Sequence, residues 1–256
     1  MFLNHLDTRS LRLDTTIVLE RFVVVLPSAN LGDVENTRTY GEACATAHAL
    51  DLIGERWALL VIRELLFGPK RFTDLRTGLP NVSPNRLSRR LRELEDLGLV
   101  QRRKLAPPSG SWVYELTEWG GELEPVIAQL GRWGRRSPFR DLDAHISSDA
   151  LMLALRGDFD PTAGDNLSAV YAIRFGEDHF VVRVADGRLD VQRGDVPEPD
   201  VAIDTDARTF AAVLTGRQDL KKAMRSGQFT LSGDPDTFGR LLDAFPRPKP
   251  VAAPAS

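Results

Sequence analysis

Residues Ser83 to Gly98, SPNRLSRRLRELEDLG, combine side chains that can hydrogen-bond to nucleic-acid bases with the pattern of a helix able to present them. Ser83 followed by proline is typical of a helix start: the serine hydroxyl can accept from a free backbone N–H, and proline lacks only a hydrogen that would have no partner. Gly98 predicts the C-terminal end. The polar residues of this stretch are Asn85, Arg86, Ser88, Arg89 and Arg92.

Helical spacing separates these polar residues from the leucines. Leu87, Leu91 and Leu94 recur on one side and predict a narrow apolar stripe. Asn85, Arg89 and Arg92 fall on the opposite side, and Arg86 and Ser88 lie on the flanks. Arginine and asparagine can each make paired hydrogen bonds to base edges in a major groove. A single helix of this composition is more often an ordinary solvated surface helix, so the neighbouring segments decide between the two readings.

The segments on either side favour nucleic-acid binding. Upstream, KRFTDLRTGLPNV predicts a short helix with Phe72, Leu75 and Leu79 inward, then a tight turn, which together with the next helix makes a helix-turn-helix. Downstream, LVQRRKLAPPSGSWVYELT predicts two strands joined by a Pro-Pro-Ser-Gly turn. This order of elements describes a winged helix-turn-helix, with Arg102, Arg103 and Lys104 on the wing.

The charge distribution agrees with a phosphate-backbone partner. Ten basic and four acidic residues lie between Lys70 and Lys104, a net charge of +6, whereas the whole chain has a net charge of −3. A local basic patch is the electrostatic footprint of nucleic-acid binding. We expect Asn85 and Arg89 to contact bases and the wing to contact phosphates. The expected DNA-binding residues are Ser83, Asn85, Arg86, Ser88, Arg89, Arg92, Arg102, Arg103 and Lys104.

These motifs resemble the HxlR-type winged helix-turn-helix transcriptional regulators. The resemblance runs continuously over residues 40–136; its markers are a tryptophan before an apolar helix, RFTDL, the core S-x-x-x-L-S-x-R-L-x-x-L-E, YELT and LGRWG. Such regulators are typically bacterial, cytoplasmic DNA-binding dimers. The resemblance therefore implies a homodimer on a double-stranded, two-fold operator.

Cys44 is the single cysteine of the chain, so an internal disulfide is excluded. It occupies the place where some HxlR-type regulators carry an oxidant-sensing cysteine, near the start of the first helix. Only a disulfide between subunits or an adduct with a small thiol would then be possible. The alternative is a small buried residue at the dimer seam, since free cysteine is often buried.

Further elements complete the expected domain. Residues 44–52 predict a helix, and WALLVIRELLFG, Trp57 to Gly68, predicts a buried central helix. Thr117 is expected to cap a second long helix. Pro125 would lie early enough in that helix to be tolerated. Its apolar stripe either closes the domain's own core or, as the resemblance implies, packs against a partner subunit. The stripe consists of Leu123, Val126, Ile127, Leu130 and Trp133.

The ends of the chain give less information. Residues 1–39 contain TIVLERFVVVLP, whose apolar runs are interrupted by Glu20 and Arg21; this is too short and too charged to span a membrane, and the order is wrong for a signal peptide. We expect a poorly ordered extension at 1–39, a linker at 137–147 and a flexible tail at 247–256. We expect no membrane insertion.

The second half has a different character. From Asp141 to the end there are 13 basic and 19 acidic residues, so this half is not expected to add phosphate contacts. A helix at SDALMLALRGDF precedes three alternating strands, AVYAIRF, HFVVRVAD and RLDVQRG, separated by hairpin turns. A strand, two short helices, a last strand and a last amphipathic helix follow.

This half, and most specifically residues 199–245, resembles the sterol carrier protein type two (SCP-like) fold. That resemblance implies a small sheet covered by helices around an apolar tunnel for lipid-like ligands. The apolar residues of the segment, such as Phe229 and Phe238, can equally be plain core, so the ligand-binding residues are not assigned.

The sequence therefore predicts an α+β protein with a winged helix-turn-helix domain at 40–136 and a small α/β-layered SCP-like lipid-binding domain at 148–246. The favoured function is a dimeric transcriptional regulator whose second domain senses an apolar small molecule. The alternative is a lipid carrier or protein-interaction module with an adaptor winged helix. We expect no enzyme, metal or cofactor, because the chain has no phosphate loop, GxSxG, metal-ligand spacing or paired carboxylates.

Overall fold

The computed structural model describes residues 39–164, 167–246 and 251–252. The extension expected at 1–39 lies, except for Thr39, outside the described residues, as does most of the tail expected at 247–256. The described residues from Tyr40 onward belong to one compact unit. In the part of the chain that is described, no helix is long and apolar enough to cross a membrane.

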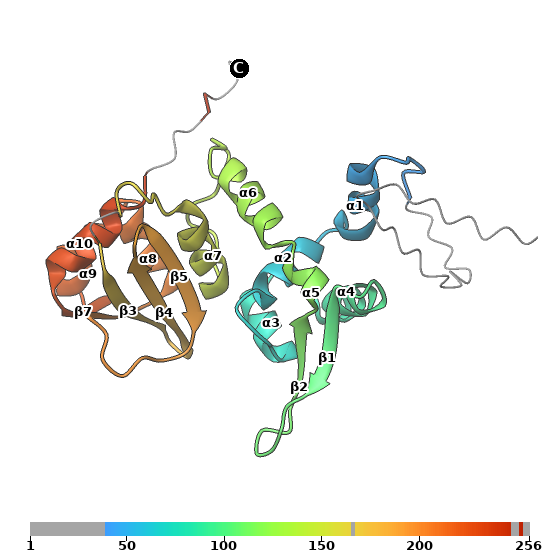
Figure 1. The fold of residues 1–256 in the computed structure, drawn as a ribbon, viewed down its shortest axis with the longest axis horizontal. Helices are drawn as coiled ribbons and strands as arrows, with labels where there is room; N and C mark the ends of the chain where they lie inside the picture. The colour runs from blue at the N-terminus through green and yellow to red at the C-terminus, as the bar shows by residue number, and fades with distance from the viewer. Residues whose placement is uncertain (1–38, 165–166, 247–250, 253–256) are drawn as a thin grey trace, which may run out of the picture. The chain divides into compact units, whose positions relative to one another are not determined.

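The first part of this unit is a winged helix-turn-helix domain (Figure 1). Helix α3 and helix α4 form the helix-turn-helix, and strands β1 and β2 pair antiparallel as the wing, with Val100 opposite Leu116 and Lys104 opposite Trp112. Both features were predicted from the sequence and are confirmed. The elements are α1 (Ala45–Ile53), α2 (Ala58–Leu65), α3 (Phe72–Gly78), α4 (Pro84–Asp96), β1 (Val100–Lys104), β2 (Trp112–Leu116), α5 (Glu118–Gly121) and α6 (Glu124–Gly134).

The second part is a five-stranded sheet with helices, in the strand order β5-β4-β3-β6-β7. Strands β3, β4 and β5 form the expected antiparallel meander, and β6 then joins β3 in parallel. Helix α8 (Ala207–Leu214) follows β6 and packs on the sheet through Phe210, which contacts Phe175 of β3 and Phe229 of β7. The elements are α7 (Ser148–Asp158), β3 (Ala169–Phe175), β4 (Asp178–Ala185), β5 (Arg188–Arg193), β6 (Val201–Thr205), α8 (Ala207–Leu214), α9 (Leu220–Arg225), β7 (Phe229–Gly233) and α10 (Pro235–Asp243).

Two local predictions were wrong in detail. Thr117 caps the short helix α5, with its hydroxyl accepting from the N–H of Gly120 at 3.1 Å, and a separate helix α6 follows. Pro125 lies in the first turn of α6, which fits its missing N–H and its steric effect on the preceding residue. Ser83 does occupy the N-cap position of α4, but its hydroxyl makes no capping hydrogen bond.

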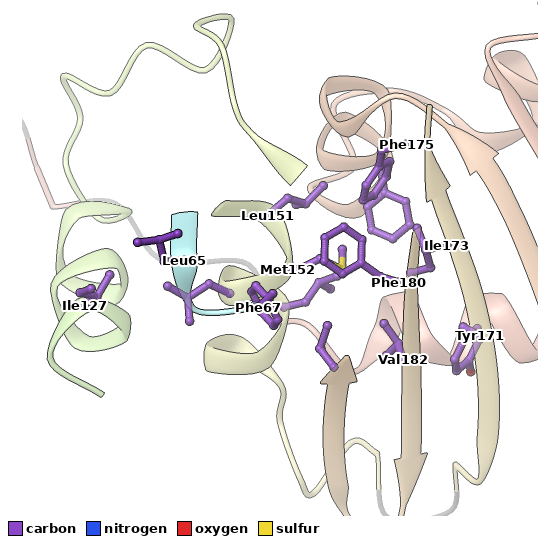
Figure 2. Packing of buried hydrophobic residues seen from close by; sticks show 14 of the residues in the cluster. Leu65, Phe67, Ile127, Leu151, Met152, Tyr171, Ile173, Phe175, Phe180 and Val182 are labelled. Carbon is purple, nitrogen blue, oxygen red and sulfur yellow. The ribbon is translucent and has the colours of Figure 1, made fainter. Parts of the chain in front are cut away.

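One apolar core runs through both parts of the unit. Phe67, just after α2, packs edge-on against Phe180 of β4 with ring centroids 5.8 Å apart. Figure 2 shows Phe67 pointing toward Met152 of α7 and toward Phe180. Deeper in the sheet domain, successive aromatic contacts fill the interior between the sheet, α8 and α10. The rings involved are Phe175, Phe210, Phe229 and Phe238.

Candidate nucleic-acid interface

Helix α4 is held by its leucine stripe. Leu87, Leu91 and Leu94 are each at most 1% exposed, so the helix cannot rotate about its axis without exposing them. Burying three leucines contributes roughly 1.5–3 kcal/mol each. The stripe therefore fixes which side chains of α4 face the solvent, as the sequence predicted.

The solvent face of α4 presents four of the predicted DNA-binding side chains. Asn85, Arg86, Arg89 and Arg92 are exposed, and Ser88 is half-buried. Arg89 lies 3.8 Å from Glu93, a loose ion pair one helical turn away. An exposed pair of this kind contributes little, so Arg89 remains available to a partner at small cost.

Two of the ten basic residues counted between Lys70 and Lys104 do not belong to this surface. Arg90 is only 6% exposed and Lys70 8%. Arg90 donates to Glu55 at 3.1 Å and also pairs with Glu93, which ties α4 to the segment after α1. The exposed basic residues that remain are Arg71, Arg76, Arg86, Arg89, Arg92, Arg102, Arg103 and Lys104.

The three basic residues of the wing are in different states. Arg102 lies over the ring of Trp112, with its guanidinium carbon 4.6 Å from the centroid. Arg103 donates from Nε to Glu115 at 2.6 Å across the hairpin, so its charge is already paired. Lys104 is exposed and has no ion pair with any residue that the structure describes. Lys104 is thus the wing cation most available to a phosphate.

Lys70 connects the wing to the sheet domain. Its backbone N–H and C=O exchange hydrogen bonds with Tyr114 of β2, at 2.9 and 2.8 Å. Its ammonium donates to Glu64 of α2 at 3.0 Å and to Asp149 of α7. A buried lysine between two carboxylates is compensated by charge-assisted hydrogen bonds. One residue therefore joins the base of the wing to the first turn of α7.

Glu64 is completely buried at this junction. Besides Lys70, its carboxylate accepts from the Arg63 guanidinium at 2.8 Å and from the Ser147 hydroxyl at 2.6 Å. Burial opposes ionisation, but these partners outweigh burial and lower the pKa of Glu64. A Cβ added at Gly78 would lie 2.1 Å from a carboxylate oxygen of Glu64, so a larger residue at the end of α3 would push this carboxylate away from its partners.

Asp149 extends the same cluster into the sheet. It is 1% exposed and accepts from Arg193 of β5 at 2.7 Å, and Arg193 also pairs with Asp178. Burial raises the pKa of Asp149, against the opposing charges of Lys70 and Arg193. No sequence motif pointed to this cluster; the available signal was a lone glutamate, Glu64, within an apolar helix and six residues before Lys70.

Cys44 is exposed at the N-cap of α1, where the N–H groups of Ala47 and Thr46 lower the pKa of its thiol.

The apolar stripe expected after Thr117 is only partly buried. Ile127 is buried, whereas Val126, Leu130 and Trp133 are 50%, 49% and 75% exposed. The stripe therefore closes the domain's own core only in part. Within the described residues no group of three or more His, Cys, Asp or Glu could hold a metal ion.

Comparison with known proteins places both parts of the chain. Residues 52–140 match the family described as HxlR-like helix-turn-helix, and residues 145–244 match the SCP-2 sterol transfer family. The uncharacterized HTH-type transcriptional regulator YybR of Bacillus subtilis is 31% identical over 122 residues, 48% of this chain and 96% of that protein. The HTH-type transcriptional regulator YodB of the same organism is 38% identical over 85 residues, 33% of this chain and 76% of YodB.

Solved structures give partial alignments. The redox regulator HypR in its oxidized form is 35% identical to this chain. The alignment covers 38% of this chain and 99% of the HypR chain, with a TM-score of 0.35. The sec-alkylsulfatase Pisa1 from Pseudomonas sp. is 18% identical with a TM-score of 0.38; the alignment covers 43% of this chain and 17% of that protein's length. By the sequence relatives, this chain belongs to the HxlR-like helix-turn-helix family of transcriptional regulators, and it carries an SCP-2 sterol transfer family domain after the winged helix.

Proposed function

We propose that this regulator binds an operator in double-stranded DNA as a homodimer, with α4 in the major groove and the wing on the flanking backbone. The observation that carries the proposal is the orientation of α4: a fully buried leucine stripe turns Asn85, Arg86, Arg89 and Arg92 to the solvent together. Arginine and asparagine read base edges. The exposed Lys104 supplies a phosphate contact beside them.

The proposed dimer face lies on α1 and α6. Val126, Leu130 and Trp133 of α6 and Leu50 of α1 are between 46% and 75% exposed. Exposed apolar side chains on the helices of a regulator domain favour a protein partner over solvent. A second copy is the occupant that the family relationship supports, and two-fold symmetry would then place two α4 helices on the two halves of one operator.

We further propose that the sheet domain senses an apolar or amphiphilic small molecule and transmits its presence to the winged helix. The membership of residues 145–244 in the SCP-2 sterol transfer family supports a lipid-like ligand. The route of coupling is the buried cluster Glu64–Lys70–Asp149, which ties the wing to α7. A ligand changes DNA affinity only if it binds the two states of the dimer with different affinity.

The test of DNA binding uses the full chain and a library of random-sequence duplexes. Selection of a two-fold sequence, followed by a gel shift whose affinity falls steeply with salt, is the expected result. Protein that binds no duplex above the level of an unrelated acidic protein would support the alternative, a lipid carrier with an adaptor winged helix. Lipid binding measured on the same sample separates that alternative from a misfolded preparation.

A further inference from the structure

A cavity of about 290 Å³ lies where helix α6, helix α7, the segment between them and helix α8 meet. Its volume is near the lower end of the roughly 300–1,000 Å³ typical of small-molecule sites. The floor is apolar: Ile127 of α6 is 7% exposed and Leu153 of α7 is 5% exposed, and Ala211 of α8 also lines it. The cavity is separate from the aromatic interior of the sheet domain.

The rim of this cavity is cationic. Five arginines line it, against the two acidic residues Asp141 and Asp158. The five are Arg63, Arg135, Arg140, Arg208 and Arg217.

The charges of these arginines are unequally compensated. Arg135 pairs with Asp158, and Arg63 pairs with Glu64. Arg208 and Arg217 share the single carboxylate of Asp143, at 3.3 and 3.5 Å.

Arg140 has no carboxylate within ion-pair distance among the described residues. The side chain of the adjacent Asp141 instead accepts from the backbone N–H of Asp143 at 2.9 Å. Arg140 is exposed as a whole residue, but partial desolvation of its guanidinium and the nearby charge of Arg217 lower its pKa. Burial together with Arg140 and Arg132 lowers the pKa of Arg135 to about 10. The arginines therefore repel one another, and an anion between them would relieve that repulsion.

We propose that this cavity binds an amphiphile with one carboxylate, such as a short- or medium-chain fatty acid, with its chain on Ile127 and Leu153 and its carboxylate on Arg140. Guanidinium and carboxylate form charge-assisted, often bidentate hydrogen bonds, and the apolar floor buries methylene groups at roughly 0.8 kcal/mol each. The side chain of Leu142, 42% exposed at the same site, adds apolar surface beside Arg140.

The position of the cavity deepens the proposed sensing role and rests on it. Ile127, Ala128 and Gly131 of α6 and its C-cap residue Arg135 line the cavity, while Val126, Leu130 and Trp133 of the same helix are exposed. A ligand in the cavity would thus contact one side of the helix whose other side is the proposed dimer face. Ligand binding and dimer geometry then share one element.

The test is isothermal titration calorimetry of the full chain with octanoic acid and, separately, with its methyl ester. The acid should bind about tenfold or more tightly than the ester, because only the acid makes the charge-assisted bond. Arg140→Gln should weaken the acid by about tenfold and leave the ester unchanged. Arg188→Gln, at an exposed arginine of β5 outside the cavity, is the matched control and should change neither.

A second variant tests the location. Ala154→Leu adds side-chain volume to a residue that lines the cavity and should displace the acid; a circular dichroism melt confirms that the variant is folded. Equal affinity for acid and ester, unchanged binding in Arg140→Gln, or no binding of the acid would each overturn the proposal. Retained operator binding in the same preparation would show that the regulator function stands while this site fails.

Discussion

Arg89 occupies the centre of the exposed face of α4, and its loose pair with Glu93 at 3.8 Å leaves it free to rearrange. Arg89→Ala should cost about 1–3 kcal/mol on the selected operator and relax its sequence preference, because a bidentate base contact is lost. Lys104→Ala should weaken all duplexes alike and flatten the salt dependence. Fluorescence anisotropy on specific and scrambled duplexes measures both, and an Arg89→Ala protein with full operator affinity would refute the assignment.

Cys44 differs from a structural cysteine in being exposed, with its thiol pKa lowered by N–H groups at the start of α1. Thiolate is the reactive form, so oxidation by diamide should join two Cys44 thiols in a covalent dimer or, with added glutathione, form a mixed disulfide, and should change operator affinity. A non-reducing gel and a gel shift measure the two effects, with Cys44→Ser as control. Wild-type protein that stays unmodified and keeps its operator affinity would make Cys44 purely structural.

At the scale of elements, α2, β2 and α7 are joined by the buried cluster around Lys70. Lys70→Met removes the ammonium and leaves Glu64 and Asp149 buried without it, which should lower the free energy of unfolding by about 3–5 kcal/mol. Chemical denaturation measures the loss. Arg76→Met, at an exposed arginine of α3, should change stability by no more than ~0.5 kcal/mol.

The double variant Lys70→Met/Asp149→Asn tests whether the loss of stability in Lys70→Met comes from the carboxylates that the ammonium compensates. It removes one of the two buried carboxylates that Lys70 compensates and leaves Arg193 paired with Asp178, so it should be more stable than Lys70→Met alone. If Lys70→Met costs less than about 1 kcal/mol, the cluster does not hold these elements together and cannot be the route of coupling.

At the scale of the whole molecule, the dimer face determines the spacing of the two α4 helices. Trp133→Glu places a charge on the most exposed aromatic residue of α6, 75% exposed, and should weaken dimerisation by two orders of magnitude or more, since burying unpaired charge at an interface costs several kcal/mol. Analytical ultracentrifugation measures this. Met224→Glu on α9, also exposed, should leave the dimer intact; a dimer unaffected by Trp133→Glu would place the interface elsewhere.

Coupling between the ligand and DNA has a thermodynamic signature at the same scale. If ligand binding changes operator affinity by some factor, operator DNA must change ligand affinity by the same factor. Calorimetric titration of octanoic acid with and without operator measures this directly. Tight binding that is identical in both titrations would leave a carrier domain without a regulatory role.

The sequence by itself determined most of the elements, though not the division between α5 and α6, and which face of α4 is polar. Leucines at helical spacing, Pro84 and Gly98 are local signals, and they predicted α4 to within two residues of its observed end. Alternating apolar residues and Gly-containing turns likewise predicted the β3–β4–β5 meander. These features depend on chain stereochemistry and local burial, which a single stretch of sequence specifies.

Only the tertiary structure decided which charges are available and where the two domains meet. From the sequence, Arg90 and Lys70 would be counted in the basic patch. In the structure both are buried beside carboxylates from other segments of the chain. The Lys70–Asp149 contact joins residues 79 positions apart, and the arginine-rimmed cavity draws on α2, α6, α7 and α8. Such contacts depend on which faces pack together, and no local pattern encodes that choice.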